Sequence, residues 1–204
     1  MAKLALAGFV LWIALALGVR SWIQLRRTGH SGIVVRASMG LGARALVGGT
    51  MVVIGLCLVP VAIGAELLGR APWWDTTRPV ASAAAIAVYA IGLVGTFASQ
   101  LAMRSSWRMG VDPTARTELV TDGPFRYVRN PIYTFAIVSA ASLVLAVPNA
   151  YSIAAFALVA LGFDLHVRQV EEPHLIASHG ERYLAWAGRT GRFVPVLGRL
   201  SRRN

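Results

Sequence analysis

The sequence contains little charge for its length. Of its 204 residues only 14% are Asp, Glu, Lys or Arg, whereas 56% are hydrophobic, and the mean hydropathy is +0.59. A water-soluble domain of this size has no need of so large an excess of apolar residues. The composition and the long uncharged runs therefore argue against an ordinary soluble enzyme and indicate an integral membrane protein.

Residue types that several kinds of site require are scarce or wrongly spaced. The single cysteine, Cys57, excludes an intramolecular disulfide framework and suits a small apolar filler inside a membrane helix. His166, His174 and His179 have no cysteine nearby and do not follow a zinc-binding spacing. No Gly-x-Ser-x-Gly turn is present. We therefore expect neither a metal site nor a Ser-His-Asp triad.

Four uncharged runs define the expected membrane segments. The first three each suit one pass of about 20 residues. The fourth would be about 51 Å long as one straight helix, too long for a hydrocarbon core of about 30 Å, and Pro148-Asn149 is a turn signal near its middle. We predict an all-α polytopic membrane protein with about five transmembrane helices, including a C-terminal helical hairpin. The runs are Leu4–Val19, Ala45–Ala65, Val80–Met103 and Asn130–Phe163.

Positive charge dominates, with nineteen Arg, one Lys and a net charge of +11. A basic balance of this kind can indicate nucleic-acid binding. Here the arginines collect in alternate connecting segments, as the positive-inside rule requires if the N-terminus is outside and the C-terminus is cytoplasmic. The cytoplasmic set comprises Arg20, Arg26, Arg27, Arg36 and Arg44, then Arg104, Arg108, Arg116, Arg126 and Arg129, then Arg168, Arg182, Arg189, Arg192, Arg199, Arg202 and Arg203.

The first apolar run resembles a cleaved signal peptide, because Lys3 precedes it and Ala14-Leu15-Ala16 lies within it. The five arginines that follow favour a retained membrane helix instead. The preference for Arg over Lys and the abundance of Ala, Gly and Val suggest a GC-rich bacterial genome. We therefore predict a location in the bacterial inner membrane.

The chain reads as one membrane domain, 1–204. Residues 1–79 hold two N-terminal transmembrane helices, and residues 80–204 hold the polar segments and the hairpin. After Asp164 the apolar spacing becomes helical, which predicts a cytoplasmic amphipathic helix interrupted near His179-Gly180. Such a helix could simply lie among the lipid headgroups with its arginines on anionic lipid.

Ionisable residues gather at the end of the last apolar run. On an α-helix Asp164 and Arg168 are i,i+4 and Arg168 and Glu171 are i,i+3, so they can form a ladder on one face. A structural ion-pair network is one interpretation. Ionisable groups close to membrane depth are rare and tend to be functional, which favours a site.

The motifs in this half of the chain resemble those of a known family. They are LVTDGPFRYVRNPIY at 119–133, RQVEEPHLIASHGERYLAW at 168–186 and RFVP at 192–195, with the apolar hairpin between the first two. Their order and spacing closely resemble the isoprenylcysteine carboxyl methyltransferase family, which is itself similar to the phospholipid methyltransferases. The resemblance covers about 100 residues and does not reach the first two helices.

The resemblance implies an S-adenosylmethionine-dependent methyltransferase embedded in the membrane, with its cofactor pocket at the cytoplasmic face. It implies that Glu171 and Glu172 face the methionine end of the cofactor or the transfer centre, with Arg168 nearby as a third catalytic residue. It implies a cofactor-binding set of Leu119, Val120, Arg129, Asn130, Pro131, Tyr133, Glu171, Glu172 and Tyr183.

Two positions depart from the family pattern. Asn130 replaces a histidine, so a donor and an acceptor are kept but titration near neutral pH is lost. Phe135 replaces a glycine and would fill space beside the helix or the ligand. Both changes bear on the acceptor more than on the cofactor.

The residue types suit this chemistry independently. Carboxylates can hold the cofactor's ammonium group, arginines its carboxylate, and aromatic faces its sulfonium and adenine. Methyl transfer is an in-line displacement that depends chiefly on positioning. A lipophilic acceptor would enter between the helices, and prenylcysteine, an aminophospholipid, a quinone-like ring or another small lipophile all fit. The alternatives are an NADPH-dependent membrane reductase resembling the steroid 5α-reductases, which Asn130 favours slightly, and a non-enzymatic scaffold.

Overall fold

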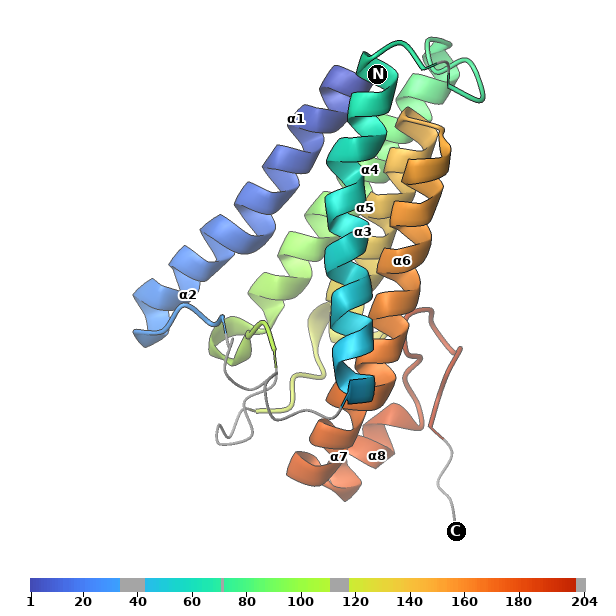
Figure 1. The fold of residues 1–204 in the computed structure, drawn as a ribbon. Helices are drawn as coiled ribbons and strands as arrows, with labels where there is room; N and C mark the ends of the chain where they lie inside the picture. The colour runs from blue at the N-terminus through green and yellow to red at the C-terminus, as the bar shows by residue number, and fades with distance from the viewer. Residues whose placement is uncertain (34–42, 71, 111–117, 201–204) are drawn as a thin grey trace.

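The computed structural model describes residues 1–33, 43–70, 72–110 and 118–200 (Figure 1). Four arginines of the predicted cytoplasmic set, at 36, 116, 202 and 203, lie outside these ranges. The described parts form helices and no strands. The helices are α1 (Ala2–Ile13), α2 (Arg20–Thr28), α3 (Ala43–Leu67), α4 (Pro79–Ala102), α5 (Pro131–Ala146), α6 (Ala150–His166), α7 (Glu172–His179) and α8 (Glu181–Ala187).

Within the described residues, four helical runs are long and apolar enough to cross a membrane, which confirms the all-α polytopic prediction. These runs are Ala2–Thr28, Leu46–Leu67, Pro79–Ala102 and Ala150–His179. Helix α5 is also apolar but has only 16 residues. Five crossings therefore remain a prediction that depends on whether this shorter helix spans the bilayer.

The hairpin predicted within the fourth apolar run is confirmed. Helix α5 ends at Ala146 and α6 begins at Ala150, on either side of Pro148. The Asn149 side chain accepts a hydrogen bond from the Ser152 amide at 3.0 Å, and the Ser152 hydroxyl accepts one from the Asn149 amide at 3.2 Å. This reciprocal cap satisfies amide groups that the start of a helix leaves free, so the turn is locally encoded.

The two most closely packed helix pairs of the bundle are α3 with α6 and α4 with α5. Glycines permit the close approach of the first pair. A Cβ atom added to Gly48 would lie 2.7 Å from the His166 amide nitrogen, and one added to Gly162 would lie 2.8 Å from the Gly48 carbonyl oxygen. Small residues at a helix crossing are the usual means of close packing inside a membrane.

The N-terminal helix extends further than the apolar run predicts. Residues Ala14–Val19 form a π-helical segment that joins α1 to α2, so one helical run continues to Thr28. Arg20, expected in a cytoplasmic loop, is instead fully buried inside this run. Its guanidinium donates to the Arg104 carbonyl at 2.7 Å and lies 4.5 Å from the Trp107 ring centroid, and these contacts offset its burial.

The C-terminal elements lie at the end of the bundle opposite the N-terminus (Figure 1). Helix α6 continues through a π-helical turn, Val167–Glu171, directly into α7. Gly180 has a φ of 53° and separates α7 from α8, which confirms the predicted interruption near His179-Gly180. The amphipathic character and the cytoplasmic location of this part remain predictions.

Candidate functional site

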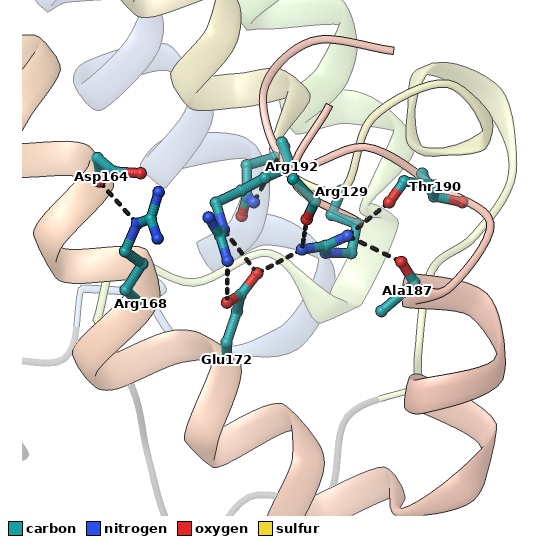
Figure 2. A network of polar contacts seen from close by, with 9 residues as sticks. Arg129, Asp164, Arg168, Glu172, Ala187, Thr190 and Arg192 are labelled. Carbon is teal, nitrogen blue, oxygen red and sulfur yellow. Dashed lines mark hydrogen bonds and ion pairs between the residues drawn. The ribbon is translucent and has the colours of Figure 1, made fainter. Parts of the chain in front are cut away.

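A buried carboxylate held by two arginines forms the centre of the polar cluster (Figure 2). Glu172 accepts a hydrogen bond from Nη2 of Arg129 at 2.6 Å and two from Arg192, at 2.9 Å each. The three side chains are between 1% and 10% exposed. Charges so deeply buried persist where they are paired and hydrogen-bonded, so the three residues depend on one another.

Arg129 also gathers the C-terminal elements around this carboxylate (Figure 2). Its Nη1 donates to the carbonyls of Ala187, at 3.0 Å, and Thr190, and its Nη2 donates to the carbonyl of Gly198 at 2.9 Å. Both terminal nitrogens are therefore fully engaged. The planar guanidinium links α7, the end of α8 and the chain that follows, a role that its fork of donors suits.

Backbone pairing fixes the segment before α5 against the segment after α8. The amide of Arg129 donates to the Gly191 carbonyl at 2.8 Å, and the amide of Asn130 donates to the Arg192 carbonyl at 3.1 Å. The Asn130 side chain donates to the same Arg192 carbonyl at 3.2 Å. Asn130 is thus a buried residue that secures a backbone contact. Pro131 follows it, also buried, and begins α5 at the first helical position, which proline favours.

A second set of polar contacts surrounds Glu171, the carboxylate next to Glu172. The Tyr133 hydroxyl donates a hydrogen bond to Oε1 of Glu171, and His166 Nε2 lies 3.6 Å from the same oxygen. Phe163 stacks on the Tyr133 ring with centroids 4.4 Å apart. Glu171 is about one-fifth exposed and, among the described residues, its Oε2 makes no hydrogen bond. The two adjacent glutamates therefore face different partners.

The π-helical turn at Val167–Glu171 explains the contact between His166 and Glu171. In a π-helix residues five apart lie over one another, so Glu171 is aligned with His166. The predicted pair of Asp164 and Arg168 is confirmed, at 2.7 Å, one helical turn before the extra residue. The predicted contact of Arg168 with Glu171 is not among the ion pairs of the described residues, because the π-turn alters the α-helical spacing on which it relied. Arg168 is half exposed at the edge of the cluster (Figure 2).

The remaining predicted residues lie in an apolar cluster behind Arg129. Leu119 is buried there with Tyr183 and Trp186, and Val120 packs against them. Tyr183 is 1% exposed and meets Trp186 edge to face at 5.7 Å. Burial and the nearby charge of Glu172 raise the pKa of Tyr183 to about 12, so its hydroxyl is protonated at physiological pH. Hydrogen bonding to Glu172 raises the pKa of Arg192.

An apolar cavity of about 400 Å³ lies between α1 and the other membrane helices. Its walls come from α1, α3, α4, α5 and α6, and Phe163 belongs to its lining. Because Phe163 also stacks on Tyr133, the cavity is one aromatic ring away from the Tyr133–Glu171 pair. Within the described residues no three His, Cys, Asp or Glu side chains are grouped so that they could hold a metal ion.

A family model described as phospholipid methyltransferase matches residues 80–182, slightly more than half of the chain. The chain belongs to the phospholipid methyltransferase family. No curated protein matches it. Together with the four membrane-compatible helices, this identifies a membrane methyltransferase. The family region runs from α4 to the start of α8 and includes Arg129, Tyr133, Glu171 and Glu172.

Several residues of this polar cluster were not among the predicted site residues. Arg192, the second partner of Glu172, lies beyond the family match, and its place in RFVP was the available signal. Phe163 and His166 contact Tyr133 and Glu171 respectively. His166 stood out only as a polar residue near the end of the last apolar run, and α-helical spacing did not pair it with Glu171 because the two meet through the π-turn. Nothing in the sequence marked Phe163.

Proposed function

We propose that this protein transfers a methyl group from S-adenosylmethionine to a lipophilic acceptor, by in-line displacement at the cytoplasmic face of the membrane. The acceptor carries an acyl or isoprenoid chain and a small reactive head, such as an amine or a carboxylate. Family membership indicates a methyltransferase, and the proposal adds which residues contact the cofactor and the acceptor.

The observation that supports a lipophilic acceptor most directly is the position of Phe163. Its ring lines the apolar cavity between the helices and stacks on Tyr133, whose hydroxyl bonds to Glu171. A hydrocarbon chain in the cavity would gain from the removal of apolar surface from water or headgroups. Its polar end would then lie beside Tyr133 and Glu171.

The residues present fit the proposed cofactor. Glu171 has a carboxylate oxygen that makes no hydrogen bond within the described residues, and this oxygen is left for the acceptor. The buried indole N–H of Trp186 has no partner in the same residues and can donate to the cofactor. Arg168 remains available for a carboxylate, whereas the terminal nitrogens of Arg129 are already engaged. We therefore assign Arg129, Glu172 and Arg192 to positioning.

When bound, S-adenosylmethionine supplies an electrophilic methyl group. For an ammonium acceptor, Glu171 takes the proton and so exposes the nitrogen lone pair. For a carboxylate acceptor no proton must be removed, and Arg168 can hold the acceptor's charge. In both cases Tyr133 fixes the Glu171 carboxylate, and the buried cluster around Glu172 keeps α5 and α7 in register.

The decisive experiment measures transfer of labelled methyl from S-adenosylmethionine to total bacterial membrane lipid by the purified, reconstituted protein, followed by identification of the product. Isothermal titration with S-adenosylhomocysteine tests cofactor binding separately. We expect binding and a labelled lipophilic product. A folded sample that binds neither S-adenosylmethionine nor S-adenosylhomocysteine would contradict the proposal, and oxidation of NADPH instead would favour the reductase.

The matched variants are Glu171→Gln and Glu181→Gln. Glu181 is an exposed residue at the start of α8, away from the contacts described above. Loss of transfer in the first variant and normal transfer in the second assign the effect to the Glu171 carboxylate.

A further inference from the structure

The chain after α8 contains a run of four exposed apolar residues, Val194, Pro195, Val196 and Leu197, here called the 194–197 tip. Val194, Val196 and Leu197 are 51%, 61% and 64% exposed. In water, the exposed apolar surface of each side chain would carry an unfavourable free energy of about 25 cal/mol per Å². Contiguous exposed apolar residues in a membrane protein mark a surface that meets another apolar phase.

The position of this segment shows which phase is in reach. The Phe193 carbonyl, next to the tip, accepts a hydrogen bond at 2.8 Å from Thr134, in the first turn of the apolar helix α5. The Asn130 amide holds the Arg192 carbonyl at the start of the same helix. After α8 the chain rises again toward the bundle (Figure 1). The tip is thus level with the end of a membrane helix.

The backbone of the tip supports a role for its side chains. Val196 has a φ of 72°, the left-handed region that disfavours a β-branched residue and that glycine occupies without strain. The turn is closed by the amide of Arg192, which donates to the Leu197 carbonyl at 2.8 Å. A valine occupies this closed turn where glycine would avoid the strain, which points to a use for the apolar side chain.

We propose that the 194–197 tip inserts into the hydrocarbon edge of the leaflet in which α5 begins. The exposed Arg199, just beyond the tip, suits the phosphate level of that leaflet. The tip is joined rigidly to the buried cluster, because Arg192 grips Glu172 and the Gly198 carbonyl accepts from Arg129. Insertion of the tip therefore anchors the C-terminal wall of the site to the bilayer. This inference does not depend on the methyl-transfer proposal.

A spin-label experiment in reconstituted vesicles tests the insertion. In a Cys57→Ala background, Leu197→Cys and, separately, Val194→Cys are labelled with a nitroxide. Collision with oxygen, which partitions into lipid, is compared with collision with a water-soluble nickel chelate. We expect a several-fold higher oxygen-to-nickel ratio at both positions than at an aqueous reference.

The chain offers both references. The native Cys57, exposed midway along α3, reports the bilayer interior, and Glu181→Cys on α8 reports water. A ratio at 194 and 197 equal to that at 181 overturns the proposal. So does shielding from both reagents, which would show that a second copy or another protein covers the tip.

Discussion

At the residue scale, the two adjacent glutamates differ in what they can do. Both carboxylate oxygens of Glu172 are hydrogen-bonded to Arg129 or Arg192. Glu171 accepts a hydrogen bond from Tyr133, and its second oxygen makes none among the described residues. Adjacent residues on an α-helix point about 100° apart, so the two carboxylates meet different neighbours. The two glutamates are adjacent in the sequence motif, but their environments differ, and on this difference we propose positioning for Glu172 and chemistry for Glu171.

Glu172→Gln should destabilise the fold. It leaves two arginines, 1% and 10% exposed, without a counter-charge, and breaking a buried pair in this way costs about 3–5 kcal/mol. We expect a marked fall in the thermal unfolding temperature of the detergent-solubilised protein. An unfolding temperature equal to that of the wild type would show that the cluster does not stabilise the structure.

Glu171→Gln should leave stability nearly unchanged and lower methyl transfer by about 10²-fold or more if the carboxylate is a general base. The glutamine can still accept from the Tyr133 hydroxyl, so the local structure is kept. Initial rates and unfolding temperatures are measured on the same preparation. Full activity in this variant would exclude an essential proton transfer to Glu171.

Tyr183 predicts a particular alkaline instability. Because burial and Glu172 raise its pKa from 10.0 to about 12, the folded state disfavours the phenolate. This contribution to stability is complete below pH 10 and falls as the pH rises from about 10 to 12, by about 2–3 kcal/mol in all. Tyr183→Phe should lack this part of the fall.

The measurement is the unfolding temperature from pH 8 to 12, with Tyr127→Phe as the control. Tyr127 is 62% exposed, so its removal should leave the pH profile parallel to that of the wild type. Parallel profiles for both variants would contradict a coupling of Tyr183 ionisation to folding.

At the element scale, helix pairing depends on backbone contact. Gly48 on α3 meets the α6 backbone near His166, and Gly162 on α6 meets α3 in return. The same stretch of α6 leads into the π-turn that carries Glu171. The packing of α3 therefore fixes the position of the end of α6 that leads to Glu171.

Adjacent glycines on α3 provide a matched test. Gly48→Ala places a methyl group 2.7 Å from backbone and should cost about 1–3 kcal/mol through overpacking. Gly49→Ala meets no atom within 4 Å and should be neutral or stabilising by up to about 1 kcal/mol, because alanine favours the helix. Unfolding temperatures and methyl-transfer rates distinguish the two. Equal effects of the two substitutions would exclude close α3–α6 packing.

At the scale of the whole molecule, the arginine distribution predicts an outside N-terminus and a cytoplasmic C-terminus. The N-terminus and α7–α8 lie at opposite ends of the bundle (Figure 1). The orientation is tested by fusing alkaline phosphatase, which is active outside the cytoplasm, after Asp75 or after Asn204 in bacterial cells. We expect activity from the first fusion and none from the second.

Green fluorescent protein at the same two positions serves as the control, because it fluoresces when cytoplasmic and should give the reverse pattern. Phosphatase activity at Asn204 with fluorescence at Asp75 would invert the topology. The proposed site would then face the outside, and S-adenosylmethionine from the cytoplasm could not reach it.

The sequence by itself determined the features that depend on local interactions. Uncharged runs identified the membrane helices, and Pro148-Asn149 identified the hairpin turn. Gly180 identified the break between α7 and α8, and the linked motifs identified the family region. Helix propensity, capping and hydrophobic length act over a few residues, so a linear pattern records them.

The tertiary structure decided what depends on distant or irregular contacts. Arg20 is buried because α4 and Trp107 surround it. Arg192 forms an ion pair with Glu172, which lies 20 residues earlier in the chain. The contact of His166 with Glu171 came from a π-turn, whose spacing of five residues an α-helical interpretation of the sequence does not contain.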